Sequence, residues 1–237
     1  MGTRAKVTKL AFVALLTTLL ASAAASADRV TSVMTRDAQA NITPAKALTM
    51  LKKGNARFVS GDATDYDYNA QVKKTATGQF PFASVLSCLD SRISPEIVFD
   101  RGIGDLFVAR VAGNFTNDDI LGSFEFASKL AGSKLIVVMG HSECGAVKGA
   151  CDAAQLGLLS TTLASINPAV AAVEGHKPRS SKNAAFVQAV SDMNVRLTMK
   201  TMRDRSVVLR QMIDSGEIDM VGAMYDISTG KVTFFKD

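Results

Sequence analysis

Short apolar runs recur along the chain, and longer segments with helical periodicity separate them. The runs at residues 82–87, 105–111 and 134–139 have the length of strands and are largely apolar. Such runs are typical of strands that are buried on both faces of a parallel sheet. Two later runs, at 220–227 and 231–235, flank a Ser-Thr-Gly turn. This last pattern predicts a terminal hairpin.

The segments around these runs predict helices. Thr43 is a suitable N-cap, and Pro44 fits the first helical turn. A helix is therefore expected over residues 45–58, with Gly61 as its stop signal. Three more helices are expected over residues 118–132, from about residue 184 onward, and over residues 206–215.

Strands that alternate with helices predict an α/β fold. We expect a mainly parallel central sheet flanked by helices, with an antiparallel edge at the C-terminus. An N-terminal helical arm over 28–80 would precede a core over 81–237 within a single domain. Three stretches lack a regular pattern: residues 28–41 predict a flexible lead, 62–78 a loop, and 160–182 a segment that contains a mobile loop.

The first 27 residues have the pattern of a secretion signal. Three basic residues precede an apolar run at 10–20, and Ala25-Ser26-Ala27 is a small-x-small cleavage site. The apolar run is short for a membrane span, although an uncleaved anchor helix is the alternative interpretation. Cleavage would leave a chain of 210 residues that begins at Asp28 and works in the periplasm.

The charge balance changes once this segment is set aside. The whole chain has 27 basic and 22 acidic residues. Three of the basic residues lie in the signal, so 24 remain against 22. The mature sequence contains no dense cluster of Lys and Arg, and we therefore expect no nucleic-acid partner. After signal cleavage we expect no membrane association either.

The chain has three cysteines, Cys88, Cys144 and Cys151. A disulfide framework in an oxidising compartment favours an even number. An odd number fits metal ligands plus one buried thiol, or one disulfide plus a spare cysteine. Cys151 is expected to be a core residue in either case.

Two polar motifs each follow an apolar run directly. Cys88, Asp90 and Arg92 alternate after the first run, so in an extended chain they share one side. His141 and Cys144 follow the third run, where the chain is expected to enter a helix. Because ligand sites of parallel sheets lie at the carboxyl ends of the strands, both motifs stand where a site is expected.

Two thiolates, one imidazole and one carboxylate form a donor set that favours Zn²⁺ over Mg²⁺ or Ca²⁺. If Asp90 ligates the metal, the tetrahedron is complete and the site is structural. If Asp90 instead makes a bidentate pair with Arg92, one position opens for water. A hydroxide there would attack a small electrophile such as carbon dioxide.

The two motifs in this order resemble those of the β-class carbonic anhydrases, in which Cys-x-Asp-Ser-Arg precedes His-x-x-Cys-Gly. Either motif alone would be a weak signal, but the combination is specific. The resemblance covers most of the mature chain and extends to the following segments: Gly54-Asn55-x-Arg57-Phe58, Gly104-Asp105-Leu106-Phe107-Val108-x-Arg110, Ala112-Gly113-Asn114 and Gly122-Ser123-x-Glu125.

The resemblance implies a role for each matching residue. Cys88, His141 and Cys144 would ligate one zinc ion per subunit. Asp90 would pair with Arg92 in the active form and become the fourth ligand in an inactive form. The implied reaction is the reversible hydration of carbon dioxide to bicarbonate and a proton, by a zinc-bound hydroxide.

The resemblance also implies a homodimer or homotetramer. In the family, a detached N-terminal helix embraces the partner subunit, and an apolar cleft at the interface leads to the metal. Phe82 and Phe107 are our candidates for that cleft. The chain departs from the family at Arg101 and Gly102, where relatives often have a Gln that donates to the substrate.

Other interpretations remain open at this point. Cys88 and Cys144 fit a disulfide or a pair of buried thiols, and Asp90 with Arg92 fits a structural ion pair. Arg110 fits either an interface ion pair or catalytic support. At the level of function, the same site suits a hydrolase of carbonyl sulfide or carbon disulfide. A zinc-stabilised binding protein whose site never opens is a third possibility.

Overall fold

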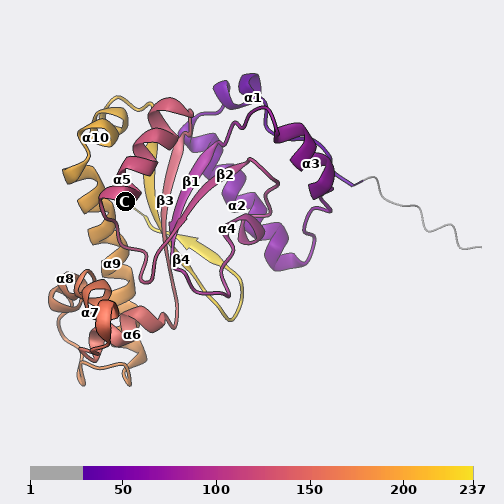
Figure 1. Cartoon of the computed structure of the whole chain (residues 1–237). Coiled ribbons are helices and arrows are strands. Elements are labelled where there is room, and N and C mark those ends of the chain that lie inside the picture. Colours follow the sequence, from indigo (N-terminus) through magenta and orange to yellow (C-terminus); the bar gives the residue numbers. More distant parts are fainter. Residues whose placement is uncertain (1–28, 237) are drawn as a thin grey trace, which may run out of the picture.

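A five-stranded sheet forms the centre of the molecule (Figure 1). The structure is a computed structural model and describes residues 29–236. The strand order is β2-β1-β3-β4-β5, in which only the β4–β5 pair is antiparallel. The strands are β1 (Ala83–Ser87), β2 (Leu106–Arg110), β3 (Leu135–His141), β4 (Asp219–Tyr225) and β5 (Val232–Phe234).

The order of the strands fixes where a site can form. The chain runs from β1 outward to β2, then crosses to β3 on the other side of β1. The carboxyl ends of β1 and β3 are neighbours, because Ser87 lies opposite Met139 in the parallel register. A reversal of strand order of this kind opens a crevice beyond the strand ends, where α/β proteins bind ligands.

Helices cover both faces of the sheet, and alternate side chains of each strand point to opposite faces. Val85 and Val137 pack with α2 and α4 in one core cluster. Leu86 and Val138 pack with α5, α9 and α10 in a second cluster. A third cluster joins α9 to the small helices α6–α8, which form the lower lobe in Figure 1.

The described helices differ widely in length. They are α1 (Arg36–Ala40), α2 (Pro44–Ser60), α3 (Tyr68–Thr75), α4 (Pro95–Val98), α5 (Asp118–Glu125), the π-helical turn η1 (Phe126–Leu130), α6 (Gly145–Cys151), α7 (Gly157–Ala164), α8 (Asn167–Ala172), α9 (Ala184–Arg205) and α10 (Val207–Asp214).

The predicted α/β fold and its antiparallel C-terminal edge are confirmed. Helix α2 begins as predicted, because the Thr43 hydroxyl accepts a hydrogen bond from the Lys46 N–H. It ends at Gly61, which has a left-handed φ of 81°. The helix expected over 118–132 is also present, but its last turn widens into the π-helical η1.

All three stretches that lacked a regular pattern contain helices, so the predicted flexible lead and the predicted loop over 62–78 were wrong. The third stretch is irregular from residue 173 onward, and its mobile loop stays a prediction. The lead contains α1, the loop contains α3, and the segment over 160–182 contains α8 and most of α7. A buried polar side chain anchors each of the first two of these helices, α1 and α3. Gln39 donates to the carbonyls of Pro81 and Ala131, and Gln71 donates to the Ser32 carbonyl.

The N-terminal helix expected to be detached is instead packed on the sheet. Ala47 and Leu51 of α2 are fully buried in the first core cluster. The predicted signal segment lies outside the described residues. Among the described residues, no helix combines the length and apolarity that a membrane crossing requires.

Candidate metal centre

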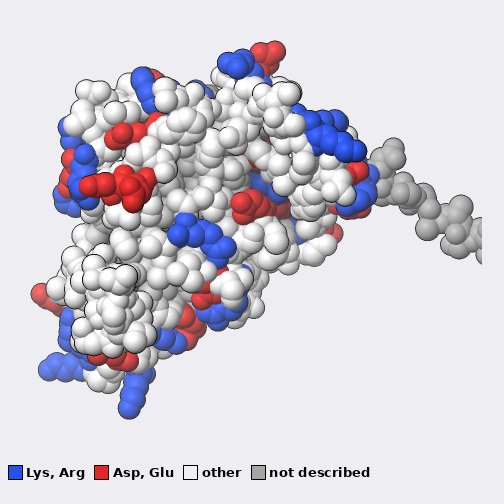
Figure 2. Space-filling view, in the orientation of Figure 1, with Lys and Arg blue, Asp and Glu red and all other residues white. Residues whose placement is uncertain are grey.

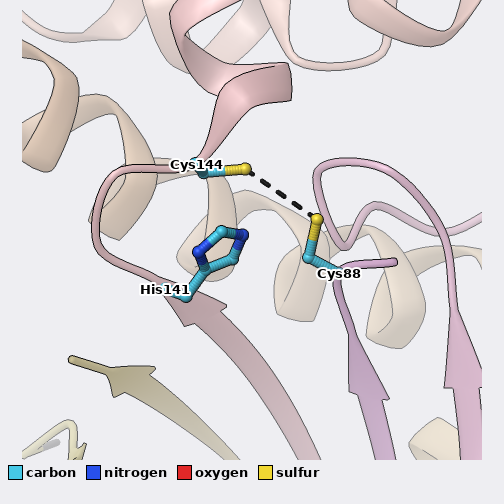
Figure 3. Close-up of side chains that lie close together, drawn as sticks. All are labelled: Cys88, His141 and Cys144. Carbon is cyan, nitrogen blue, oxygen red and sulfur yellow. Dashed lines mark hydrogen bonds between the residues drawn. The ribbon is translucent and has the colours of Figure 1, made fainter. Parts of the chain in front are cut away.

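Three of the predicted ligands come together at the switch point between β1 and β3. Cys88 directly follows β1, and His141 is the last residue of β3. Cys144 is the N-cap of α6, where the loop after β3 enters the helix. In Figure 3 the three side chains point toward one another from these different elements.

The geometry of this group suits a small cation. One ligand atom from each of Cys88, His141 and Cys144 lies within 4.8 Å of the others, and all three residues are buried. The two sulfur atoms are 3.9 Å apart, well beyond the roughly 2.05 Å of a disulfide. The arrangement is therefore one of two free thiols beside an imidazole.

The imidazole of His141 is oriented for ligation. Its Nδ1 lies 2.9 Å from the Ser142 carbonyl oxygen. Because a carbonyl only accepts hydrogen bonds, Nδ1 carries the proton, and the lone pair then resides on Nε2. Nε2 is buried and has no hydrogen-bond partner among residues 29–236. A buried polar atom without a partner is costly, and a metal ion in the group would satisfy it.

The two sulfurs differ in acidity because they face each other. A hydrogen bond from the Cys144 thiol lowers the pKa of Cys88, with a smaller contribution from the Gly113 N–H. The same contact with Cys88, together with burial, raises the pKa of Cys144. Backbone N–H groups of Ala146 and Val147, at the start of α6, lower the pKa of Cys144 by less. A divalent cation would stabilise both sulfurs as thiolates.

Asp90 stands beside this group but is paired elsewhere. Arg92 donates to it through Nε at 2.9 Å, through Nη2 at 2.7 Å, and through its backbone N–H at 3.0 Å. This pairing holds the pKa of Asp90 well below its usual range. The nearest carboxylate oxygen, Oδ2, is 4.0 Å from Nε2 of His141. The structure thus contains the Asp90–Arg92 pair rather than a four-residue ligand cluster.

Arg110 has a structural task that the sequence left open. Its Nε donates to the Cys88 carbonyl at 3.0 Å, and its Nη2 donates to the Asp90 carbonyl at 2.6 Å. Arg110 thereby fixes the backbone of the loop that carries both residues. The side chain lies at the end of β2, in register with Ser87, so the parallel pairing of β1 and β2 brings it there.

The two aromatic residues predicted to line the cleft lie apart from the clustered ligands. Phe82 is fully buried in the core, so that prediction was wrong. Its ring lies under the guanidinium of Arg101, which donates to the Met50 carbonyl of α2. Phe107 lines a groove of about 640 Å³ along β2 together with Phe126, and this lining includes none of the clustered ligands.

Comparison with known proteins identifies the family. Residues 83–232, which contain β1 to β4 and the first residue of β5, match the family model described as carbonic anhydrase. The chain is 34% identical over 200 residues to carbonic anhydrase 2 of Mycobacterium tuberculosis, across 81% of this chain and 92% of that protein. The chain belongs to the carbonic anhydrase family. A carbonic anhydrase of Pseudomonas aeruginosa is 32% identical over 167 residues, across 68% of this chain and 76% of that protein.

Solved structures identify the class of carbonic anhydrase. The fold is similar to one of two tetrameric β-carbonic anhydrases from the ascomycete Sordaria macrospora, with a TM-score of 0.60 and 26% identity. That match covers 70% of this chain and 85% of the fungal chain. The β-carbonic anhydrase CafA of Aspergillus fumigatus has a TM-score of 0.62 over 81% of this chain, at 22% identity. The carbonic anhydrase described here therefore has the β-class fold.

Proposed function

We propose that this carbonic anhydrase binds zinc and catalyses the reversible hydration of carbon dioxide to bicarbonate and a proton. Cys88, His141 and Cys144 would hold the ion. One observation carries the proposal: a buried group of two thiols and an imidazole, with an unpartnered Nε2, lies beside the ion pair of Asp90 and Arg92.

The donor set fits zinc on chemical grounds. Soft thiolates select zinc over magnesium or calcium, and two thiolates with one imidazole form a known zinc arrangement that leaves one position open. When bound, zinc brings the pKa of a coordinated water toward neutrality and so supplies a nucleophile for carbon dioxide. The protein's own contribution is to keep that position free.

Asp90 and Arg92 are proposed to act together to keep the fourth position of the zinc ion free. The bidentate pair directs both carboxylate oxygens of Asp90 toward Arg92. Because the pairing holds the pKa of Asp90 low, the carboxylate stays ionised and does not take up the reaction's proton near neutral pH. Its Oδ2, 4.0 Å from Nε2 of His141, is placed to accept a hydrogen bond and orient the attacking group.

This arrangement favours an enzyme over a zinc-stabilised binding protein. A structural site of two thiolates, an imidazole and a carboxylate would need Asp90 as its fourth ligand, and Arg92 would then lack a partner. A hydrolase of carbonyl sulfide or carbon disulfide would use the same groups. Only a comparison of turnover on the different substrates therefore distinguishes that activity from carbon dioxide hydration.

The test is a stopped-flow comparison of the zinc-loaded protein with three substrates: carbon dioxide, carbonyl sulfide and carbon disulfide. We expect rapid hydration of carbon dioxide, increasing from neutral to alkaline pH, and slow turnover of the sulfur analogues. Preferred turnover of an analogue would replace the proposed substrate. A fully zinc-loaded protein inactive on all three would favour the binding protein.

We further propose that the chain works as a homodimer or homotetramer joined along β2. No described strand pairs with the outer edge of β2. Apolar side chains lie near it on both sides: Phe126 is 52% exposed and Ile97 is 58% exposed. The related enzymes of Sordaria macrospora are described as tetrameric. Sedimentation analysis of the zinc-loaded protein tests this, and a monomer at micromolar concentration would contradict it.

A periplasmic location is a separate proposal that rests on residues 1–27 alone. Their basic start, apolar run and small-x-small site fit a cleaved signal. N-terminal sequencing of the protein from a periplasmic extract tests it, with Asp28 expected as the first residue. A full-length chain retained in the membrane fraction would favour the anchor helix instead.

A further inference from the structure

One of the buried polar side chains of helix α9 bonds to a loop beside the candidate metal centre. Asn194 lies in the middle of α9 and is only 3% exposed. Its Nδ2 donates a hydrogen bond of 2.7 Å to the carbonyl oxygen of Gly113. The two residues are 81 positions apart in the sequence, so the bond ties α9 to the loop that follows β2.

That loop contacts a proposed metal ligand directly. The N–H of Gly113 points at the sulfur of Cys88, 3.4 Å away. Gly113 has a left-handed φ of 83°, and a Cβ there would lie 2.4 Å from Cδ1 of Ile166, which is fully buried. Gly113 is therefore enclosed by Cys88 on one side, Ile166 on another and Asn194 at its carbonyl.

We propose that Asn194 is a positioning residue for the metal centre, acting through Gly113 on Cys88. The bond from Asn194 holds the Gly113 backbone so that its N–H faces the Cys88 sulfur. A hydrogen bond to a ligating sulfur fixes the direction of its lone pairs and tunes its strength as a donor. This inference rests on the proposed zinc site.

Loss of the Asn194 amide would disturb this chain of contacts at its buried end. The Gly113 carbonyl would be left unpaired in the core, which is unfavourable unless the loop moves to find another donor. Any such movement shifts the N–H away from Cys88. Partners of metal ligands typically change metal affinity by about 10- to 100-fold when they are removed, and we expect an effect in that range.

The experiment compares zinc affinity in the wild-type chain and in Asn194→Leu, which keeps the side-chain size but removes the donor. Ser191→Ala is the matched control, since Ser191 lies one turn earlier on α9, is equally buried, and bonds only to the Val187 carbonyl of its own helix. Chelator competition gives the dissociation constants, and far-UV circular dichroism checks the fold. The thiolate-to-cobalt absorption band of the cobalt-loaded proteins reports on the Cys88 bond itself.

We expect Asn194→Leu to bind zinc about 10- to 100-fold more weakly than wild type, in the range given for such partners, and to show an altered cobalt band. Ser191→Ala should match the wild type in both. If Asn194→Leu does not fold, Asn194→Ser is measured in its place, because its short hydroxyl leaves Gly113 without the amide donor. A folded Asn194 variant with wild-type affinity and an unchanged cobalt band would overturn the inference. A wild-type protein that binds no zinc would instead contradict the proposed function.

Discussion

At the scale of single residues, the candidate metal centre consists of side chains that are chemically ordinary until they are buried together. Cys88 and Cys144 are 56 positions apart, yet their sulfurs are 3.9 Å apart at the ends of neighbouring elements. His141 is fully buried between them, with one ring nitrogen oriented by a carbonyl and the other unpartnered. Each residue therefore supplies one donor to the same small space.

The role of Cys144 is tested by replacing its sulfur with oxygen. Cys144→Ser keeps the size of the side chain but removes a thiolate, which zinc binds far better than a neutral hydroxyl. We expect the purified variant to have lost most of its zinc, as measured by elemental analysis. Cys151→Ser is the control, because Cys151 lies outside the ligand group. A Cys144→Ser protein with full zinc content and full activity would refute the ligand role.

At the scale of elements, α2 packs closely against the end of α4. Gly54 of α2 touches the backbone at the end of α4, where a Cβ would lie 1.8 Å from the Phe99 carbonyl oxygen. Asp100, the residue after Phe99, is buried and accepts hydrogen bonds from Arg57 and Thr64. The motif Gly54-Asn55-x-Arg57 thus has a packing function that is separate from the chemistry.

The surroundings of Gly54 in α2 and Gly122 in α5 predict opposite effects of a Gly→Ala change on stability. Gly54→Ala should lower the free energy of unfolding by about 1–3 kcal/mol, because the helices must separate. Gly122→Ala in α5 should raise it by roughly 0.5–1 kcal/mol, since nothing lies within 4 Å of its Cβ and alanine favours helix. Urea unfolding measures both. A neutral or stabilising Gly54→Ala would contradict the packing of α2 described here.

Asp100 predicts a dependence of stability on pH. Burial raises the pKa of Asp100, but hydrogen bonds from Thr64 and Arg57 outweigh burial and leave the pKa below its ordinary value. A carboxylate with a lowered folded-state pKa stabilises the fold above its unfolded pKa of about 3.9, and this contribution fades as the pH falls through the folded value.

The matched variant is Asp100→Asn, which suits the left-handed φ of 48° at this position. In metal-free protein, where zinc loss cannot contribute, wild type should be more stable than Asp100→Asn at pH 7. The difference should shrink toward pH 3. Urea unfolding at both pH values measures it, and a difference that is constant with pH would show that the charge of Asp100 does not matter.

Much of this element structure was accessible from the sequence, and the misses have physical causes. The strand β3 was recognisable because burial on both faces leaves an uninterrupted apolar run, here at residues 135–139. Helices α3 and α7 are eight residues each, too short for helical periodicity to stand out. Phe82 was wrongly assigned to the cleft because the sequence shows that a residue is apolar but not whether its side chain packs in the core or lines a cleft.

At the scale of the whole molecule, the chain brings its chemistry together at one end of a single sheet. The ligand motifs were predictable because they follow strands directly. The sequence left Arg110 open between an interface ion pair and catalytic support, and it gave no signal for Asn194. Their contacts with Asp90 and Gly113 span 20 and 81 positions. On the face shown in Figure 2, acidic and basic side chains are scattered in small groups of both signs. The edge along β2 is where we propose a second copy docks.

In the proposed function, Arg92 keeps Asp90 away from the zinc ion, which Asp90 as a fourth ligand would close to substrate. In Arg92→Ala, the Asp90 carboxylate loses its bidentate partner and is free to occupy the fourth position of the tetrahedron. The change should therefore leave zinc binding intact and remove catalysis.

The most direct measurement is stopped-flow hydration of carbon dioxide by wild type and Arg92→Ala at equal, verified zinc content. We expect rapid hydration by the wild type and at least a hundredfold lower rate in the variant. A loss of about 10²–10³ is typical when a group that supports the transition state is removed. A zinc-loaded wild type without activity, or an Arg92→Ala protein at the wild-type rate, would contradict it.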